Sequence, residues 1–208
     1  MDGTMLDNMQ YHLQAWQKIV SEAGSDLKGD EIFKQLYGKN TEILTRILGT
    51  KKFTPDQIKE MAYRKDAFYR EIYAPHIKLL PGLKDFLTEA KKEKVLLAIA
   101  SATADKNVEF VIDALDIRSL FNVIISGSDV KTSKPDPETF LKAAEGLDIL
   151  PSDCIVFEDV PQGVEAASRA AMTAVVLLTS HKKQDFDEFS NVIKTITDFK
   201  SINVKELL

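Results

Sequence analysis

Two adjacent carboxylates, Glu158 and Asp159, directly follow residues 154–157, an apolar run with the length of a buried β-strand. Carboxylates at the end of such a strand repel each other and lose hydration, and a hard divalent cation relieves both effects. Mg²⁺ suits this position because it takes oxygen ligands, keeps several waters and bridges to phosphate. The alternative is that one acid caps the next helix and the other is solvated.

A hydroxyl group follows another apolar run, residues 95–100. The sequence Ser-Ala-Thr begins there at Ser101, and a hydroxyl with the backbone amides of a helix start can hold a phosphate. The alternative is that Ser101 only caps the helix. Lys134 lies in Ser-Lys-Pro-Asp-Pro, residues 133–137, a stiff segment that suits a fixed charge aimed at a carboxylate and a phosphate. The alternative is an ordinary solvated lysine.

The elements that must position these groups are strands of a parallel sheet. Apolar runs of strand length alternate with helical patterns after residue 82, and they are residues 95–100, 123–125, 154–157 and 174–178. This alternation predicts an α/β fold in which helices cover both faces of a parallel sheet. Ligands of such sheets bind beyond the carboxyl ends of the strands, where the candidate residues lie.

The segment from about residue 8 to residue 76 has a helical pattern throughout. Apolar residues at helical spacing are Met9, Leu13, Trp16 and Val20, and later Ile43, Leu44, Ile47 and Leu48. A third helix is predicted to start where Thr54 caps and Pro55 takes the first turn. Trp16 is expected in the core of this small bundle.

Composition excludes several classes of protein. The chain has 208 residues, 44% of them hydrophobic, which is enough for a sizeable core. The net charge of −5 has no long like-charge blocks, so a general nucleic-acid or membrane surface is not expected. No run approaches the roughly 18 to 20 apolar residues of a membrane span. A single cysteine, Cys154, cannot form an internal disulfide, which favours a cytoplasmic setting.

The order of the motifs resembles the haloacid dehalogenase superfamily. Asp-Gly-Thr at residues 2–4 comes first, then Ser-Ala-Thr, Lys-Pro-Asp-Pro, and Glu-Asp followed by Gly163. The resemblance covers nearly the whole chain, and residues 7–16 with the helical insert look like the branch of β-phosphoglucomutase and sugar-phosphate phosphatases. It implies a Rossmann-like parallel-sheet core of residues 1–8 and 77–208 and a small α-helical cap of residues 9–76.

The resemblance also implies residue roles. Asp2 would be the general acid/base, and its backbone carbonyl would bind Mg²⁺ together with the Asp159 side chain and Glu158. The transferring phosphoryl group would be held by Ser101 and Lys134, with help from the backbone amides of Gly3 and Ala102. Two positions depart from the usual pattern of relatives: Val160 replaces a common Ser, and Ala171 replaces a common Gly.

The family motif reads Asp-x-Asp-Gly-Thr, and its first aspartate, the nucleophile, is not among the 208 residues. We therefore expect the complete protein to begin upstream of Met1, with the nucleophile at the end of a central strand. Without that strand, buried backbone groups would stay unpaired at roughly 1 to 3 kcal/mol each, against a total stability of about 5 to 15 kcal/mol. The sheet of residues 1–208 is then expected to show a gap or a rearranged strand.

Residues 37–41 are the expected specificity loop of the cap, where Lys39 and Asn40 offer polar contacts to the substrate; the alternative is an ordinary helix connection. Related mutases have an arginine near Thr41, whereas here Arg46 lies further along, and Lys39 is a weaker substitute. His12 matches a mutase histidine that helps to position the acid/base, or else it is a surface or packing residue.

The expected function is a Mg²⁺-dependent phosphatase of a small phosphorylated metabolite, most simply a sugar phosphate, acting through an aspartyl-phosphate. The alternatives are a hexose-phosphate mutase of the β-phosphoglucomutase type and a catalytically dead phosphate-binding remnant. A monomer or weak homodimer is expected. His76 and His181 have no motif context and are expected to be solvated.

Overall fold

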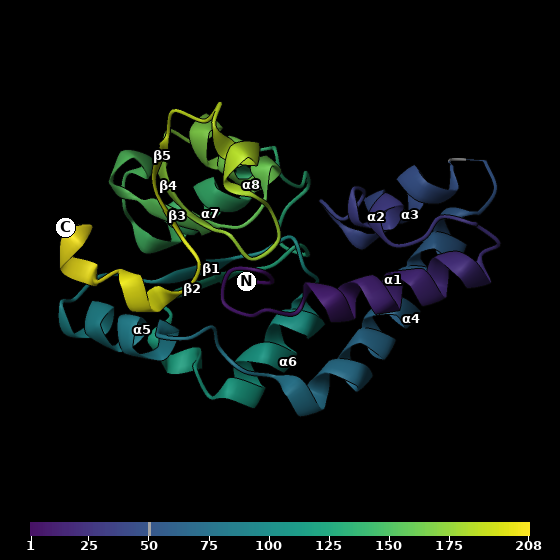
Figure 1. Cartoon of the computed structure of the whole chain (residues 1–208), viewed down its shortest axis with the longest axis horizontal. Helices are drawn as coiled ribbons and strands as arrows, with labels where there is room; N and C mark the ends of the chain where they lie inside the picture. Colours follow the sequence, from purple (N-terminus) through teal and green to yellow (C-terminus); the bar gives the residue numbers. More distant parts are fainter. Residues whose placement is uncertain (50) are drawn as a thin grey trace. The chain divides into compact units, whose positions relative to one another are not determined.

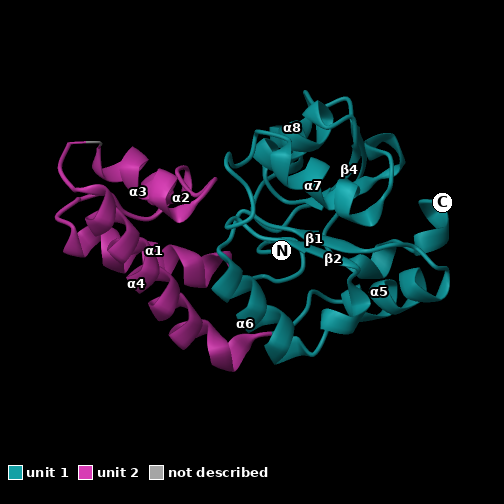
Figure 2. Cartoon of the chain, turned by 180° about the vertical axis from the view of Figure 1, so that it is seen from behind, with its two compact units in different colours: residues 1–7, 78–208 teal, residues 8–77 magenta. Residues whose placement is uncertain are grey.

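The computed structural model describes residues 1–49 and 51–208, which divide into two compact units. Unit 1 consists of Met1–Asp7 and Lys78–Leu208, and unit 2 is Asn8–Ile77 (Figure 2). No helix of the described residues is both long and apolar enough to cross a membrane.

Unit 2 is helical, as its apolar spacing predicts. Its helices are α1 (Met9–Glu22), α2 (Asp30–Phe33), α3 (Asn40–Leu48) and α4 (Pro55–Tyr73), and α1 runs beside α4 (Figure 1). Their apolar faces meet in one core that contains Trp16, Ile19, Val20, Ile32, Ile43, Leu44, Ile58 and Ala62. The expectation that Trp16 is a core residue is confirmed, because only 2% of it is exposed.

The start of α4 follows the predicted cap. The Thr54 hydroxyl accepts a hydrogen bond from the Gln57 amide at 3.3 Å, and the Thr54 amide donates to Gln57 Oε1 at 2.8 Å. Each residue thus satisfies a backbone group that the first turn of a helix leaves without an intrahelical partner. Pro55 takes the first helical position, where its missing N–H is harmless.

Unit 1 is the α/β part of the chain (Figure 1). In chain order its elements are α5 (Leu83–Lys92), β1 (Ala98–Ala100), α6 (Asp105–Leu115), β2 (Val123–Ile125), α7 (Glu138–Leu147), β3 (Ile155–Glu158), α8 (Pro161–Arg169), β4 (Thr173–Leu177) and β5 (Val192–Ile196). All strand pairs in these elements are parallel, so the predicted α/β class with parallel strands is confirmed. Each of the four predicted runs overlaps one strand, from β1 to β4, and β5 was not predicted.

The strands form two separate groups instead of the single sheet that the pattern predicts. One group is β1 beside β2, and the other has the order β3-β4-β5. Neither β1 nor β3 has a strand partner on its second edge among the described residues. The described strands thus show the gap in the sheet that the sequence analysis expects.

Helices on both faces hold β3 in place. Val156 on one face shares a core cluster with Phe140 of α7 and Val164 of α8, and Ala100 of β1 packs against the same cluster. Phe157 on the other face contacts Phe86 of α5 and Phe199, with ring centroids 5.5 and 5.4 Å apart. The residues that follow β3 therefore start from a strand fixed on both sides.

Candidate active site

The carboxylates of Glu158 and Asp159 lie at the carboxyl end of β3, and both are buried, with 5% and 4% exposed. Helix α8 starts two residues later, and its N-cap residue, Val160, makes no side-chain capping bond. The alternative of a helix cap and a solvated acid is therefore wrong. Two buried carboxylates side by side need compensating charge or protonation.

Lys134 supplies the first compensating charge. Its ammonium is 9% exposed, forms an ion pair with Glu158 and donates to the Ala100 carbonyl at 3.4 Å. The alternative of a solvated lysine is wrong. Ala100 ends β1 and Glu158 ends β3, so one ammonium joins the carboxyl ends of the two strand groups.

The Asp159 carboxylate contacts Gly3 and Thr4 of the Asp-Gly-Thr loop. The Thr4 hydroxyl donates to Asp159 Oδ1 at 3.1 Å, and the Ser180 hydroxyl donates to Oδ2 at 2.7 Å. Gly3 has a φ of +65°, and a Cβ on it would lie 1.9 Å from Asp159 Oδ2. Only glycine fits there, because the carboxylate occupies the space that any side chain would fill.

The pKa values of Glu158 and Asp159 shift in opposite directions. Burial, and then the charge of Glu158, raise the pKa of Asp159 to about 7. Burial also opposes ionisation of Glu158, but the Lys134 ammonium outweighs it and the pKa of Glu158 is lowered. The metal-free pair thus keeps a proton near neutral pH, and Asp159 is the group that holds it.

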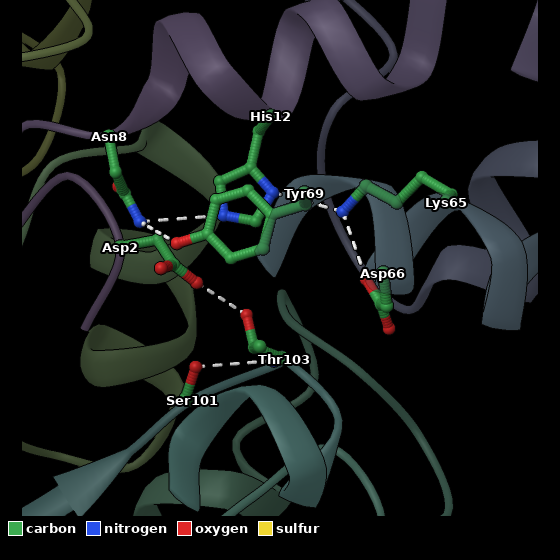
Figure 3. A network of polar contacts seen from close by, with 8 residues as sticks. All are labelled: Asp2, Asn8, His12, Lys65, Asp66, Tyr69, Ser101 and Thr103. Atoms are coloured by element: carbon green, nitrogen blue, oxygen red, sulfur yellow. Dashed lines mark hydrogen bonds and ion pairs between the residues drawn. The ribbon is translucent and has the colours of Figure 1, made fainter. Parts of the chain in front are cut away.

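Asp2 is oriented by a residue of the second motif (Figure 3). The Thr103 hydroxyl donates to Asp2 Oδ2 at 2.5 Å. Ser101 Oγ accepts the Thr103 amide at 3.2 Å, which leaves the Ser101 hydroxyl proton available for another acceptor. Helix α6 begins only at Asp105, with Ala104 as its N-cap, so the alternative that Ser101 caps it is wrong. Ala102 is half-buried between the two hydroxyl residues.

Unit 2 contains its own buried polar cluster (Figure 3). The ammonium of Lys65, only 2% exposed, lies 2.9 Å from His12 Nδ1 and 3.2 Å from Asp66 Oδ1. An ammonium only donates, so His12 Nδ1 is the acceptor in this contact. The His12 ring stacks on Tyr69 with centroids 3.8 Å apart, and Asn8 donates to the Tyr69 hydroxyl at 2.7 Å. His12 therefore belongs to a charged network, which the lone histidine in the sequence did not reveal.

The expected specificity loop is held by Arg46. Its guanidinium stacks over the Tyr37 ring at 3.7 Å and donates to the backbone carbonyls of Gln35 and Tyr37 at 2.5 and 3.2 Å. Lys39 and Asn40 are half-buried at the start of α3. The two terminal nitrogens of Arg46 thus donate to backbone carbonyls in the loop and just before it.

Three loop residues were missed or misjudged by the sequence analysis. Thr179 donates to the Gly3 carbonyl, and Ser180 donates to the Asp159 carboxylate. His181 was expected to be solvated, which is wrong: it is half-buried, with Nδ1 3.1 Å from the Asp159 carbonyl oxygen. The signal was present, since Thr-Ser-His follows the run that forms β4. His76, also expected to be solvated, is exposed.

The carboxylate and carbonyl oxygens of the site in unit 1 suit a magnesium ion that keeps several of its waters. Within residues 1–49 and 51–208 there is no group of three or more His, Cys, Asp or Glu side chains that could hold a metal. Mg²⁺ does not require one, because it is commonly bound through one or two carboxylates with waters and phosphates. Asp159 is a buried acid with a raised pKa, held by the Thr4 and Ser180 hydroxyls, and a bound cation would favour its ionised form.

Several known proteins are similar to this chain in sequence or structure. A 5-amino-6-(5-phospho-D-ribitylamino)uracil phosphatase of Arabidopsis thaliana chloroplasts is 28% identical over 99% of the chain, although the chain spans 56% of that relative's length. β-Phosphoglucomutase of Bacillus subtilis is 31% identical over 84% of the chain and 79% of its own length. A crystal structure of a hydrolase from Entamoeba histolytica superposes with a TM-score of 0.88 at 25% identity, covering 100% of this chain and 94% of that one.

The family model described as haloacid dehalogenase-like hydrolase matches residues 1–177, which include the Asp-Gly-Thr, Ser-Ala-Thr, Lys-Pro-Asp-Pro and Glu-Asp sequences. These are the sequences whose side chains meet at the ends of β1 and β3. The chain therefore belongs to the haloacid dehalogenase-like hydrolase family.

Proposed function

We propose that this chain belongs to a Mg²⁺-dependent phosphatase that acts on a small phosphorylated metabolite, in the first place a sugar phosphate, through an aspartyl-phosphate. The observation that carries the proposal is the junction at the strand ends. There Lys134 spans Ala100 and Glu158, Thr4 holds Asp159, and Thr103 holds Asp2. The acid/base, the phosphate-binding cation and the carboxylates suited to a metal ion thus come from four separate sequence motifs.

Each group has a role in phosphoryl transfer. The Ser101 hydroxyl and the Lys134 ammonium bind the transferring phosphoryl oxygens, with the Gly3 and Ala102 amides beside them. Asp2 gives a proton to the leaving oxygen and later takes one from the attacking water. Glu158, Asp159 and the Asp2 carbonyl would hold Mg²⁺, which would supply charge stabilisation for the phosphoryl oxygens.

The nucleophile of the proposal is an aspartate upstream of Met1, carried by a strand that pairs with β1 and β3. The unpaired edges of these two strands support this, as does Lys134, which reaches both strand ends. Parallel strands satisfy backbone groups on both sides, so a strand between them would remove the unpaired edges. It would also bring its carboxyl end to the residues described above.

Phosphate release tests the proposal. A longer chain that carries the upstream aspartate is expected to release phosphate from some members of a sugar-phosphate panel with Mg²⁺, and not after EDTA treatment. The same chain with Asp2→Asn is expected to lose most of this activity, because the acid/base is gone. No release by the longer chain from any substrate would refute the proposal. Turnover by the 208-residue chain itself would remove both the upstream nucleophile and the alternative of a catalytically dead remnant.

A hexose-phosphate mutase is the second candidate, favoured by the similarity to β-phosphoglucomutase. A mutase must hold a second phosphate while the intermediate reorients. Arg46 is poorly placed for that, because each of its two terminal nitrogens already donates to a backbone carbonyl, that of Gln35 or Tyr37. Interconversion of glucose 1-phosphate and glucose 6-phosphate that requires a bisphosphate activator would establish the mutase.

We place the proposed enzyme in the cytoplasm, because its single cysteine, Cys154, cannot form an internal disulfide.

A further inference from the structure

The loop that follows β4 joins both carboxylate-bearing loops of unit 1. Leu178 continues the strand pairing, since its amide donates to the Ile196 carbonyl at 2.8 Å. The next three side chains all turn to the candidate site. Thr179 bonds the Gly3 carbonyl, Ser180 bonds the Asp159 carboxylate, and His181 bonds the Asp159 backbone.

The Asp159 carboxylate is held by two hydroxyls on opposite oxygens. Thr4 donates to Oδ1 at 3.1 Å, and Ser180 donates to Oδ2 at 2.7 Å. With one oxygen fixed from each side, the carboxylate cannot rotate about its Cβ–Cγ bond without breaking a bond. Each oxygen keeps lone-pair capacity for a cation after accepting one hydrogen bond.

The backbone of Asp159 is held from the same loop. A carbonyl oxygen only accepts, so the 3.1 Å contact with His181 requires a proton on Nδ1. The edge of the His181 ring packs on Phe186, with centroids 6.1 Å apart, and Phe186 is 3% exposed. A buried aromatic ring therefore sets the position of the histidine.

We propose that Ser180 and His181 are positioning residues for Asp159, which they orient so that its carboxylate binds a divalent cation. The inference rests on the metal site of the proposed function. Partners that orient a metal-binding carboxylate typically change metal affinity by about 10- to 100-fold when removed. A loop with a purely structural role would change stability instead and leave the affinity of the folded protein unaltered.

Mn²⁺ binding by the 208-residue chain tests this, measured as loss of the free Mn²⁺ electron paramagnetic resonance signal. Ser180→Ala is expected to raise the dissociation constant about tenfold or more. Ser180→Thr keeps the hydroxyl and should bind like the unaltered chain. Ser152→Ala, an exposed serine before β3, is the matched control and should have no effect.

Variants of His181 provide an independent test if Ser180→Ala folds poorly. His181→Ala is expected to weaken Mn²⁺ binding, and His181→Asn, whose amide can still donate to the Asp159 carbonyl, should restore part of it. Ring ¹⁵N chemical shifts of the metal-free chain should report the tautomer protonated on Nδ1. The other tautomer would contradict the assigned role of His181.

These outcomes distinguish failure of the positioning role of Ser180 and His181 from failure of the metal site itself. Loss of Mn²⁺ binding in Asp159→Asn with unaltered affinity in Ser180→Ala and His181→Ala would overturn the inference and leave the metal site standing. Equal Mn²⁺ binding by the unaltered chain and Asp159→Asn would overturn the metal site and the inference together. Weaker binding in the Ser180 and His181 variants, with urea midpoints close to that of the unaltered chain, would support both.

Discussion

The hydroxyl of Thr103 donates to the carboxylate of Asp2 at 2.5 Å, although 101 residues separate them in the chain. Thr103→Val removes the donor at almost constant volume. In the chain that carries the upstream aspartate, kcat is expected to fall about tenfold or more, because a misplaced acid/base loses part of its typical 10²- to 10⁴-fold contribution. Thr103→Ser should retain activity. The matched control is Thr88→Val on α5, whose hydroxyl bonds only the Lys84 carbonyl at 2.7 Å among its described contacts; equal turnover in both valine variants would contradict the role of Thr103.

Gly163 leaves room for Glu158. A Cβ on Gly163 would lie 2.2 to 2.5 Å from the Glu158 carboxyl atoms, so Gly163→Ala must displace the partner of Lys134. We expect a loss of about 1 to 3 kcal/mol in unfolding free energy, measured with urea. Gly146→Ala in α7 is the control, because the atoms nearest to its added Cβ are the two Val123 methyls at 3.0 Å and no carboxylate is among the three nearest atoms. Both variants gain about 1 kcal/mol of helix propensity, so a more stable Gly163→Ala protein would disprove the steric argument.

Stability of the metal-free chain should depend on pH through Asp159. Its carboxyl has a pKa of about 7 in the folded chain against an ordinary 3.8, so between pH 4 and 7 the folded state binds more protons than the unfolded state. The unfolding free energy therefore falls as pH rises through this window, by up to about 4 kcal/mol. Asp159→Asn should lack this decrease, measured by urea unfolding at a series of pH values.

Glu158 acts with the opposite sign. Its pKa is lowered, so its contribution is present above its ordinary value of 4.5 and is lost as the pH falls. Because the Glu158 charge is one cause of the raised pKa of Asp159, the difference between the unaltered chain and Asp159→Asn reports Asp159 together with its interaction with Glu158. Saturating Mg²⁺ should remove most of that difference, since a bound cation replaces the proton. Identical pH profiles without metal would rule out a buried, titrating Asp159.

Lys65 is a buried cation in unit 2, and Asp66 is its closest carboxylate partner at 3.2 Å. Lys65→Met keeps the volume but leaves that acid buried without its ion-pair partner, at about 3 to 5 kcal/mol of unfolding free energy. Adding Asp66→Asn should recover part of the loss, so the two changes are not additive. The control on the same helix is Lys59→Met, because Lys59 and Asp56 are exposed and 3.7 Å apart; its effect should stay within about 0.5 kcal/mol.

Ala171 adopts a φ of +60°, a conformation that costs a non-glycine residue about 1 to 2 kcal/mol. Glycine removes this strain but loses about 0.5 to 1 kcal/mol through greater freedom of the unfolded chain. Ala171→Gly is therefore expected to raise the melting temperature slightly, by a gain of about 0.5 to 1 kcal/mol. Ala170→Gly, with a φ of −82° and a buried methyl, should lower it.

The sequence predicted elements and motifs better than it predicted contacts. Periodicity located α1 and α4, and apolar runs located β1 to β4, because burial on one or both faces dictates those patterns. Strand β5 was missed since Lys194 interrupts its apolar run, as an edge strand permits. The division of the strands into two groups is a pairing property, which was expected only through the family resemblance.

The missed site residues share a physical cause. Thr103, Ser180 and His181 act through single hydrogen bonds to groups distant in the sequence, and no periodicity encodes such bonds. Lys65 is harder still, because a lysine in an amphipathic helix normally belongs to the solvated face. Its burial depends on His12 and Asp66 together, and neither residue alone predicts it.

Within residues 1–49 and 51–208, β1 and β3 each have one edge without a strand partner, which bears on how concentrated solutions of this chain behave. An open strand edge is a template for intermolecular β-pairing, which proceeds toward aggregates unless charge or cover blocks it. Neither β1 nor β3 places a lysine or proline along its edge, and the only charge in either strand is Glu158 at the end of β3. Light scattering should therefore rise with protein concentration more steeply for this chain than for one in which a strand fills the gap.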